Sequence, residues 1–291
     1  MTTNGFLPVE LKDGLHLDNV LAREIGEAGM GEYAFAEPFA HTVIDGFLPA
    51  VVAEELLAHF PAEKKQHDKV YDKGYGGQFK RQVSPYDCDE WLKCAFAFFN
   101  SPAMLEFLEG LTNIKGLIPD PYFNGGGLHE ISTGGMLGIH ADFQVNEALQ
   151  LRRRINVLIY LNKDWQAAYG GELELWDKGM QHKVRSVAPL FNRCVIFNTD
   201  ADSFHGHPDP LTTPADITRK SIALYYYTAQ PIENSSGESR HTLYVARPND
   251  TPENIAQAKK LAAKRDKRAK KMHVGNSTGL RNKIKSLLGL D

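Results

Sequence analysis

Residues 128–142 read LHEISTGGMLGIHAD, a stretch in which short apolar runs are separated by small and turn-forming residues. The same texture continues in the later segments INVLIYL (155–161), GELELW (171–176), VRSVAPL (184–190), RCVIFN (193–198) and KSIALYYYT (220–228). Segments rich in Ile, Val, Leu, Phe and Tyr that alternate with turn signals are typical of an antiparallel β-sandwich or jelly roll. We therefore expect a jelly-roll core between residues 113 and 232.

The segments on either side of this core are expected to be largely helical. After a short strand in HTVIDGFL (41–48), Pro49 opens a helix that ends before Pro61, and two further helices cover 90–100 and 102–111. Beyond the core, a lysine- and alanine-rich helix begins at Thr251-Pro252 and ends near Met272, GNSTG breaks it, and a short amphipathic helix follows. The sequence thus predicts an α+β chain with three regions, which are an N-terminal helical region (1–112), the core (113–232) and a C-terminal extension (233–291).

Composition limits the class of protein. The chain has 291 residues, of which 42% are hydrophobic and 24% charged, as is ordinary for a globular protein with a sizeable core. No apolar run reaches the length that spans a bilayer, and the N-terminus does not read as a signal peptide. Cys88, Cys94 and Cys194 are odd in number and form no CxxC pair, which indicates neither a disulfide framework nor a zinc site. We expect a reducing, cytoplasmic location.

Charge is distributed unevenly along the chain. From residue 251 to the end, 11 Lys and Arg stand against 3 Asp and Glu, whereas the rest of the chain has a net charge of −11. This basic tail is either a solvated helix that packs loosely on the acidic body or a surface that binds nucleic acid or another acidic partner. The sequence leaves both interpretations open, and it does not indicate an oligomeric state.

The motif with the clearest chemistry is His140-Ala141-Asp142. On a strand, positions 140 and 142 lie on the same face, so both side chains can contact one metal ion. A further ligand must come from elsewhere, and His205 directly follows the strand RCVIFN; His207, two residues later, is a rival. Two histidines and one carboxylate form the facial ligand set of non-haem iron(II) oxygenases.

A second feature lies on the strand TRKSIALYYYT (218–228). Arg219 and Ser221 share one face of that strand and Lys220 the other. An arginine that points into a barrel requires an anionic partner, and its planar fork suits the distal carboxylate of a dicarboxylate. Alternatively, Arg219 begins the strand and points to solvent.

The order of these parts resembles the prolyl 4-hydroxylase-like family of Fe(II)/2-oxoglutarate-dependent dioxygenases. The matching stretches cover most of residues 41–230 and are HTVIDGFLP (41–49), His140-Ala141-Asp142, YLNKDW (160–165), GGEL (170–173), SFHG (203–206) and Arg219-Lys220-Ser221. The resemblance implies a double-stranded β-helix core, with His140, Asp142 and His205 as iron ligands. It also implies that Arg219, Ser221 and Tyr160 bind the co-substrate, although Tyr160 could equally be a core aromatic.

The resemblance further implies hydroxylation of an unactivated C–H bond with O2 and 2-oxoglutarate, which yields succinate and CO2, with ascorbate as an optional reductant. Its substrate would be a prolyl residue of a peptide or a small amino-acid-like molecule. Two alternatives from other classes stay open at this point. One is a cupin-like metal protein with non-oxidative chemistry, and the other is a binding module that recruits an acidic partner through its basic tail.

Overall fold

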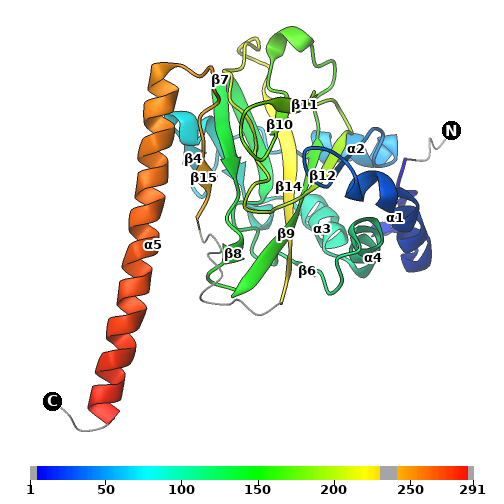
Figure 1. Ribbon diagram of the computed structural model, residues 1–291. Helices are drawn as coiled ribbons and strands as arrows, with labels where there is room; N and C mark the ends of the chain where they lie inside the picture. The colour runs from blue at the N-terminus through cyan, green and yellow to red at the C-terminus, as the bar shows by residue number, and fades with distance from the viewer. Residues whose placement is uncertain (1–4, 230–240, 288–291) are drawn as a thin grey trace.

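A barrel of antiparallel strands forms the centre of the computed structural model, which describes residues 5–229 and 241–287 (Figure 1). For residues 270–287 only the course of the backbone is described. The strands of the barrel and of the segments that join it are β3 (His41–Ile44), β4 (Lys69–Tyr71), β5 (Gln78–Val83), β6 (Ile118–Pro119), β7 (Gly127–Ala141), β8 (Val145–Asn146), β9 (Leu151–Tyr160), β10 (Leu173–Trp176), β11 (Lys183–Val187), β12 (Cys194–Asn198), β13 (His205–His207), β14 (Arg219–Thr228) and β15 (Leu243–Tyr244).

These strands form two layers that share β7. The order β11-β10-β13-β7-β14-β9-β12-β3 runs through both layers, and every pairing in it is antiparallel. Strand β7 joins the layers because it is 15 residues long: its first half pairs with β14 and β5, and its second half with β13 and β15. The predicted jelly-roll core, in its double-stranded β-helix form, is confirmed.

Helices cover one layer of the barrel on its outer face, on the right in Figure 1. They are α1 (Asn19–Ala34), α2 (Ala50–Ala58), α3 (Glu90–Phe99) and α4 (Pro102–Thr112). Short elements complete this half of the chain, namely β1 (Glu10–Leu11), β2 (Leu15–His16) and the 3₁₀ turns η1 (Gly74–Gly76) and η2 (Pro85–Asp87); a third turn, η3 (Ala167–Tyr169), lies later. The helices expected after Pro49 and over 90–100 and 102–111 are confirmed as α2, α3 and α4, whereas α1 was not predicted. Strands β3 and β5, although they precede residue 113, belong to the barrel sheet, so the division of the chain into three regions remains a proposal.

Alternation along β9 separates the main core from the barrel interior. Ile155, Val157 and Ile159 are fully buried in the core that the helices form against the sheet, whereas Asn156 and Leu158 line a cavity inside the barrel. Strand β14 alternates in the same way, because Ile222 and Leu224 face the helices while Ser221, Ala223 and Tyr225 face the cavity. The sheet is therefore apolar toward the helices and carries its polar groups on the inside.

The C-terminal helix α5 (Pro252–Leu287) lies on the opposite side of the barrel from α1–α4 and extends past its end (Figure 1). The break expected at GNSTG (275–279) is wrong, because the helix continues through this segment. Glycine in a helix interior costs only about 1 kcal/mol relative to alanine, and no proline interrupts the segment. The last residues of the expected final helix, 288–290, lie outside the described residues.

Candidate metal centre

Three side chains from two strands meet at one end of the barrel cavity. His140 is the last but one residue of β7, Asp142 follows that strand, and His205 begins β13, which pairs with β7. Because His205 is paired directly with His140 across the two strands, their rings lie 4.4 Å apart between centroids. One ligand atom from each of the three residues lies within 4.8 Å of the others. The carboxylate of Asp142 is 3.8 Å from Nε2 of His140 and 3.6 Å from Nε2 of His205.

Both imidazole rings are oriented by backbone carbonyl groups. The Nδ1 atom of His140 lies 2.9 Å from the Gly138 oxygen, and Nδ1 of His205 lies 2.9 Å from the Ser203 oxygen. A carbonyl oxygen only accepts, so each Nδ1 carries the proton and each Nε2 presents its lone pair to the cluster. Burial, reinforced by the neighbouring His205, lowers the pKa of His140 to about 3. Burial also lowers the pKa of His205, so both rings are neutral near pH 7, which is the form that binds a metal.

Asp142 is stabilised as an anion by two residues of β9. Its Oδ2 atom accepts from Nδ2 of Asn156 at 2.8 Å and lies 3.0 Å from a terminal nitrogen of Arg153. Burial by itself raises the pKa of this carboxyl, but Arg153 and the two histidines outweigh burial and hold it below its usual range. The guanidinium of Arg153 also stacks on Tyr225, 3.5 Å from the ring centroid. The carboxylate is thus charged and fixed in direction before any ion binds.

Arg153 was not predicted to have this role. It belongs to a run of three arginines (152–154), and such charge runs are usually solvated, but Arg153 is only 2% exposed and pairs with Asp142. A shift in register between β9 and β14 places both Arg153 and Asn156 on the cavity side. Such an irregularity reverses which residues face inward, so strict alternation in the sequence could not identify Arg153.

A second polar group lies elsewhere in the same cavity. Arg219 is 5% exposed, its Nε donates to the Gly171 carbonyl at 2.8 Å, and its guanidinium lies 3.4 Å from the hydroxyl of Tyr160. The backbone of Gly171 has φ +72°, a conformation that is strained for other residues, and a Cβ there would also displace the Leu211 side chain, 2.5 Å away. Ser221 lines the cavity beside Arg219. Arg219 therefore points inward as expected, and the solvent-facing alternative is wrong.

His207, the rival ligand, does not belong to the cluster. Among the residues that the structure describes, the group that could bind a metal is His140, Asp142 and His205. The side chain of His207 lines the same cavity, is 4% exposed, and has no hydrogen-bond partner on either ring nitrogen among the described residues. An unpaired polar group in a buried site is costly, which indicates that something in the cavity satisfies it.

Comparison with known proteins agrees with this geometry. Residues 126–227, which contain the metal cluster and Arg219, match the family model described as the 2OG-Fe(II) oxygenase superfamily. The chain carries a 2-oxoglutarate- and iron(II)-dependent oxygenase domain. The resemblance expected from the motifs is confirmed at the level of this superfamily, and this oxygenase is an enzyme. Neither the cupin-like metal protein nor the binding module is favoured.

Solved structures with a similar fold include prolyl hydroxylases. A prolyl 4-hydroxylase from Phytophthora capsici is 20% identical to the oxygenase, with a TM-score of 0.50 over 89% of this chain and 79% of that one. A prolyl-4-hydroxylase from Pseudomonas putida is 20% identical, with a TM-score of 0.48 over 69% and 98%. A prolyl hydroxylase from Trichoplax adhaerens, solved with a hypoxia inducible factor peptide, is 18% identical, with a TM-score of 0.49 over 72% and 91%. At such identities the likeness to the Phytophthora enzyme supports the fold alone.

Proposed function

We propose that His140, Asp142 and His205 bind Fe(II) and that Arg219, with Ser221 and Tyr160, binds the distal carboxylate of 2-oxoglutarate. The observation that carries this proposal is that one cavity of about 190 Å³ contains both the three-residue cluster and a buried arginine. The described partners of the Arg219 side chain, the Gly171 carbonyl and the Tyr160 hydroxyl, are both neutral. A dicarboxylate would supply the missing negative charge.

The unpaired ring of His207 fits the same ligand. It lies in the cavity with Arg219, and the electrostatic influence of Arg219 contributes to its lowered pKa, after that of burial. A neutral imidazole offers one N–H donor, which a carboxylate oxygen of the co-substrate would accept. The donors of this part of the cavity are therefore suited to an anion with several oxygen acceptors.

When bound, iron and 2-oxoglutarate would supply the oxidising chemistry, in which a C–H bond is hydroxylated with O2 and the co-substrate leaves as succinate and CO2. The residues of the chain would contribute position and electrostatics. The carbonyls of Gly138 and Ser203 keep both histidines in the tautomer that binds a metal. The Arg153–Asn156 pair keeps the carboxylate of Asp142 directed at the same point.

We propose as substrate a prolyl residue of a peptide or a small amino-acid-like molecule, as the family resemblance suggests. The similar folds of enzymes described as prolyl hydroxylases are consistent with this choice. Ascorbate is proposed as an optional reductant, and a cytoplasmic location remains a prediction from the cysteines, all three of which are free. Among the described residues, no helix is long and apolar enough to cross a membrane.

A matched pair of histidine variants tests the ligand assignment. His205→Ala should lose stoichiometric Fe(II) binding, because it removes one of three ligands, whereas His207→Ala should keep it. Metal content is measured after anaerobic loading and desalting. His140→Ala should also abolish the 2-oxoglutarate-dependent release of succinate. Metal retained by His205→Ala but lost from His207→Ala would overturn the assignment.

A further inference from the structure

A second cavity opens beside the metal cavity, between the β4–β5 hairpin, β15 and residues 261–268 of α5. It has a volume of about 370 Å³. The two cavities share five lining residues, which are Tyr71, Gly76, Phe143, Thr242 and Tyr244. The two cavities are therefore adjacent, and we call the outer one the α5 groove. Tyr244 lies at the junction, with its ring 5.4 Å from that of His140.

The α5 groove is lined by basic and aromatic side chains. Its cationic residues come from the hairpin and from one face of α5, and they are Lys73, Lys264, Arg265 and Arg268. Among the described residues that line it there is no aspartate or glutamate. This contrasts with the body of the chain, which has a net charge of −11 before residue 251. A surface of one sign inside a body of the other sign selects a ligand of complementary charge.

The positive charge continues inward from the groove toward the metal cluster. The ammonium groups of Lys73 and Lys80 both lie over the ring of Tyr71, each with Nζ 5.4 Å from the ring centroid. Lys80 lines the metal cavity itself, and within the part of the chain that the structure describes its ammonium has no hydrogen bond or ion pair. Burial is the main cause that lowers the pKa of Lys80, to about 8, with Arg219 and Arg153 adding to it and Asp142 opposing it. An anionic group of a ligand would relieve this unpaired cation.

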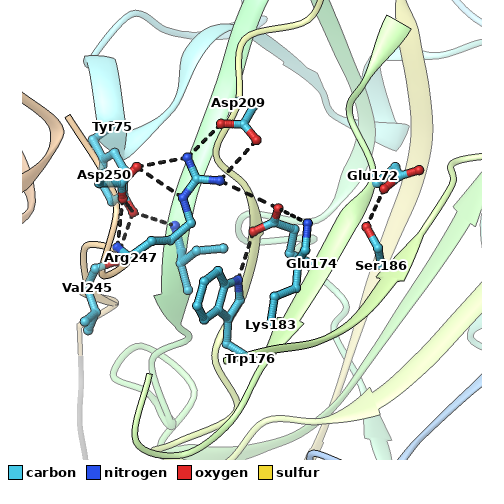
Figure 2. Close-up of polar contacts among 11 residues, drawn as sticks. Tyr75, Glu172, Glu174, Trp176, Lys183, Ser186, Asp209, Val245, Arg247 and Asp250 are labelled. Atoms are coloured by element: carbon cyan, nitrogen blue, oxygen red, sulfur yellow. Dashed lines mark hydrogen bonds and ion pairs between the residues drawn. The ribbon is translucent and has the colours of Figure 1, made fainter. Parts of the chain in front are cut away.

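The beginning of α5 is fixed against the barrel by polar contacts, so the groove has a defined shape. The Gln257 side chain accepts from the backbone N–H of Tyr75 at 2.8 Å, and the Tyr75 hydroxyl contacts both Asp250 and the backbone N–H of Ile139. Figure 2 shows Arg247 at the centre of the adjoining network, where it pairs with Asp209 and Asp250 and approaches Glu174. The segment that carries the basic groove is therefore connected to β7, one residue before the first histidine of the cluster.

We propose that the α5 groove binds an acidic polypeptide segment that leads the reacting residue of the substrate to the metal. This inference rests on the proposed function and gives its substrate a chemical class. The face of α5 from Leu261 to Arg268 is about 10 Å long at 1.5 Å per residue. That length matches about three residues of extended peptide. The inner cavity of about 190 Å³ must also contain the co-substrate, which leaves room for a side chain rather than a nucleobase.

Binding of labelled peptides tests this proposal without relying on turnover. The probes are a fluorescein-labelled glutamate-rich peptide, its glutamine counterpart, and a single-stranded oligonucleotide of equal charge, each measured by anisotropy. The groove variant is Lys264→Glu/Arg268→Glu. Its matched control, Lys259→Glu/Lys267→Glu, makes the same change of charge at exposed positions of α5 that do not line the groove.

The glutamate peptide should bind the wild-type protein, and added salt should weaken it. Its affinity for the groove variant should be about tenfold lower than for the wild type, since two attractive contacts become repulsive. Its affinity for the control variant should be nearly the same as for the wild type. Lys80→Met should also weaken binding of the glutamate peptide, because it removes the cation that lines the metal cavity. Equal loss in groove and control variants, no binding of the peptide, or tighter binding of the oligonucleotide would each overturn the proposal.

Metal content and succinate release without substrate separate this proposal from the one on which it rests. If the proposed function is right and the groove assignment is wrong, wild type and both variants bind Fe(II) and release succinate slowly, but peptide affinity does not follow the groove charges. If the proposed function is wrong, no form releases succinate, whatever the peptide does.

Discussion

A substitution of Arg219 should change the affinity for 2-oxoglutarate strongly and the stability of the fold only slightly. Replacing it with leucine removes the fork that we assign to the distal carboxylate of 2-oxoglutarate. Truncating one partner of a buried, hydrogen-bonded charge pair costs about 2–5 kcal/mol of binding free energy. At about 1.4 kcal/mol per factor of ten, the dissociation constant of 2-oxoglutarate should rise roughly 30-fold to several-thousand-fold.

The same substitution should change stability little. Without the co-substrate, the Arg219 side chain contacts only the Gly171 carbonyl and the Tyr160 hydroxyl among the described residues, and no carboxylate loses a partner. A hydrogen bond from a charged donor contributes about 1.5–3 kcal/mol, but removing the buried charge itself offsets much of that loss. The melting temperature should therefore fall by a few degrees at most.

The assay is a chemical double-mutant cycle. Wild type and Arg219→Leu are titrated anaerobically, with metal bound, using 2-oxoglutarate and 2-oxopentanoate, which has a methyl group in place of the distal carboxylate. The variant should bind 2-oxoglutarate much more weakly than the wild type does, whereas its affinity for 2-oxopentanoate should hardly change. Lys220→Met, on the opposite face of β14, serves as the control and should bind both ligands like the wild type. Equal weakening of the two ligands by Arg219→Leu would refute the carboxylate assignment.

Three further predictions concern charges around the two cavities. Arg153→Met leaves the buried carboxylate of Asp142 without its ion-pair partner, so the metal-free protein should lose about 3–5 kcal/mol of unfolding free energy in urea; a loss under 1 kcal/mol would show that the pair is not formed. Arg247→Met should release α5 from the barrel and so increase protease cleavage after residue 251, whereas cleavage at the wild-type rate would argue against the anchoring network. Lys80 is charged below its pKa of about 8 and neutral above it. The affinity for the glutamate peptide should therefore fall as the pH rises through 8 in the wild type but not in Lys80→Met. Parallel pH profiles of the two proteins would exclude a role for Lys80 in peptide binding.

Alternation along strands was enough to predict part of the site. It placed His140 with Asp142, and Arg219 with Ser221, on common faces, and the structure brings all four to one cavity. Local pattern also found α2, α3 and α4, whose starts carry Pro49 or a capping side chain from Asp89 or Ser101. These features depend on residues that are near in sequence.

The remaining features depend on contacts between distant segments. The inward position of Arg153 requires the register shift between β9 and β14, which involves residues some 70 positions apart along the chain. Lys80 reaches the cavity because β5 pairs with β7, and the local sequence GYGGQFKRQ (74–82) carries no sign of that pairing. Strand β15 forms only by pairing beside His140. No periodicity within a single segment could reveal these arrangements.

The central claim is that one cavity binds Fe(II) through His140, Asp142 and His205 together with 2-oxoglutarate. Its most direct test is an anaerobic titration of the Fe(II)-loaded protein with 2-oxoglutarate, followed by visible absorption. A weak charge-transfer band should grow to saturation at one equivalent per chain and should be absent from His205→Ala. A wild-type protein that binds Fe(II) yet shows no such band at saturating 2-oxoglutarate would contradict the claim.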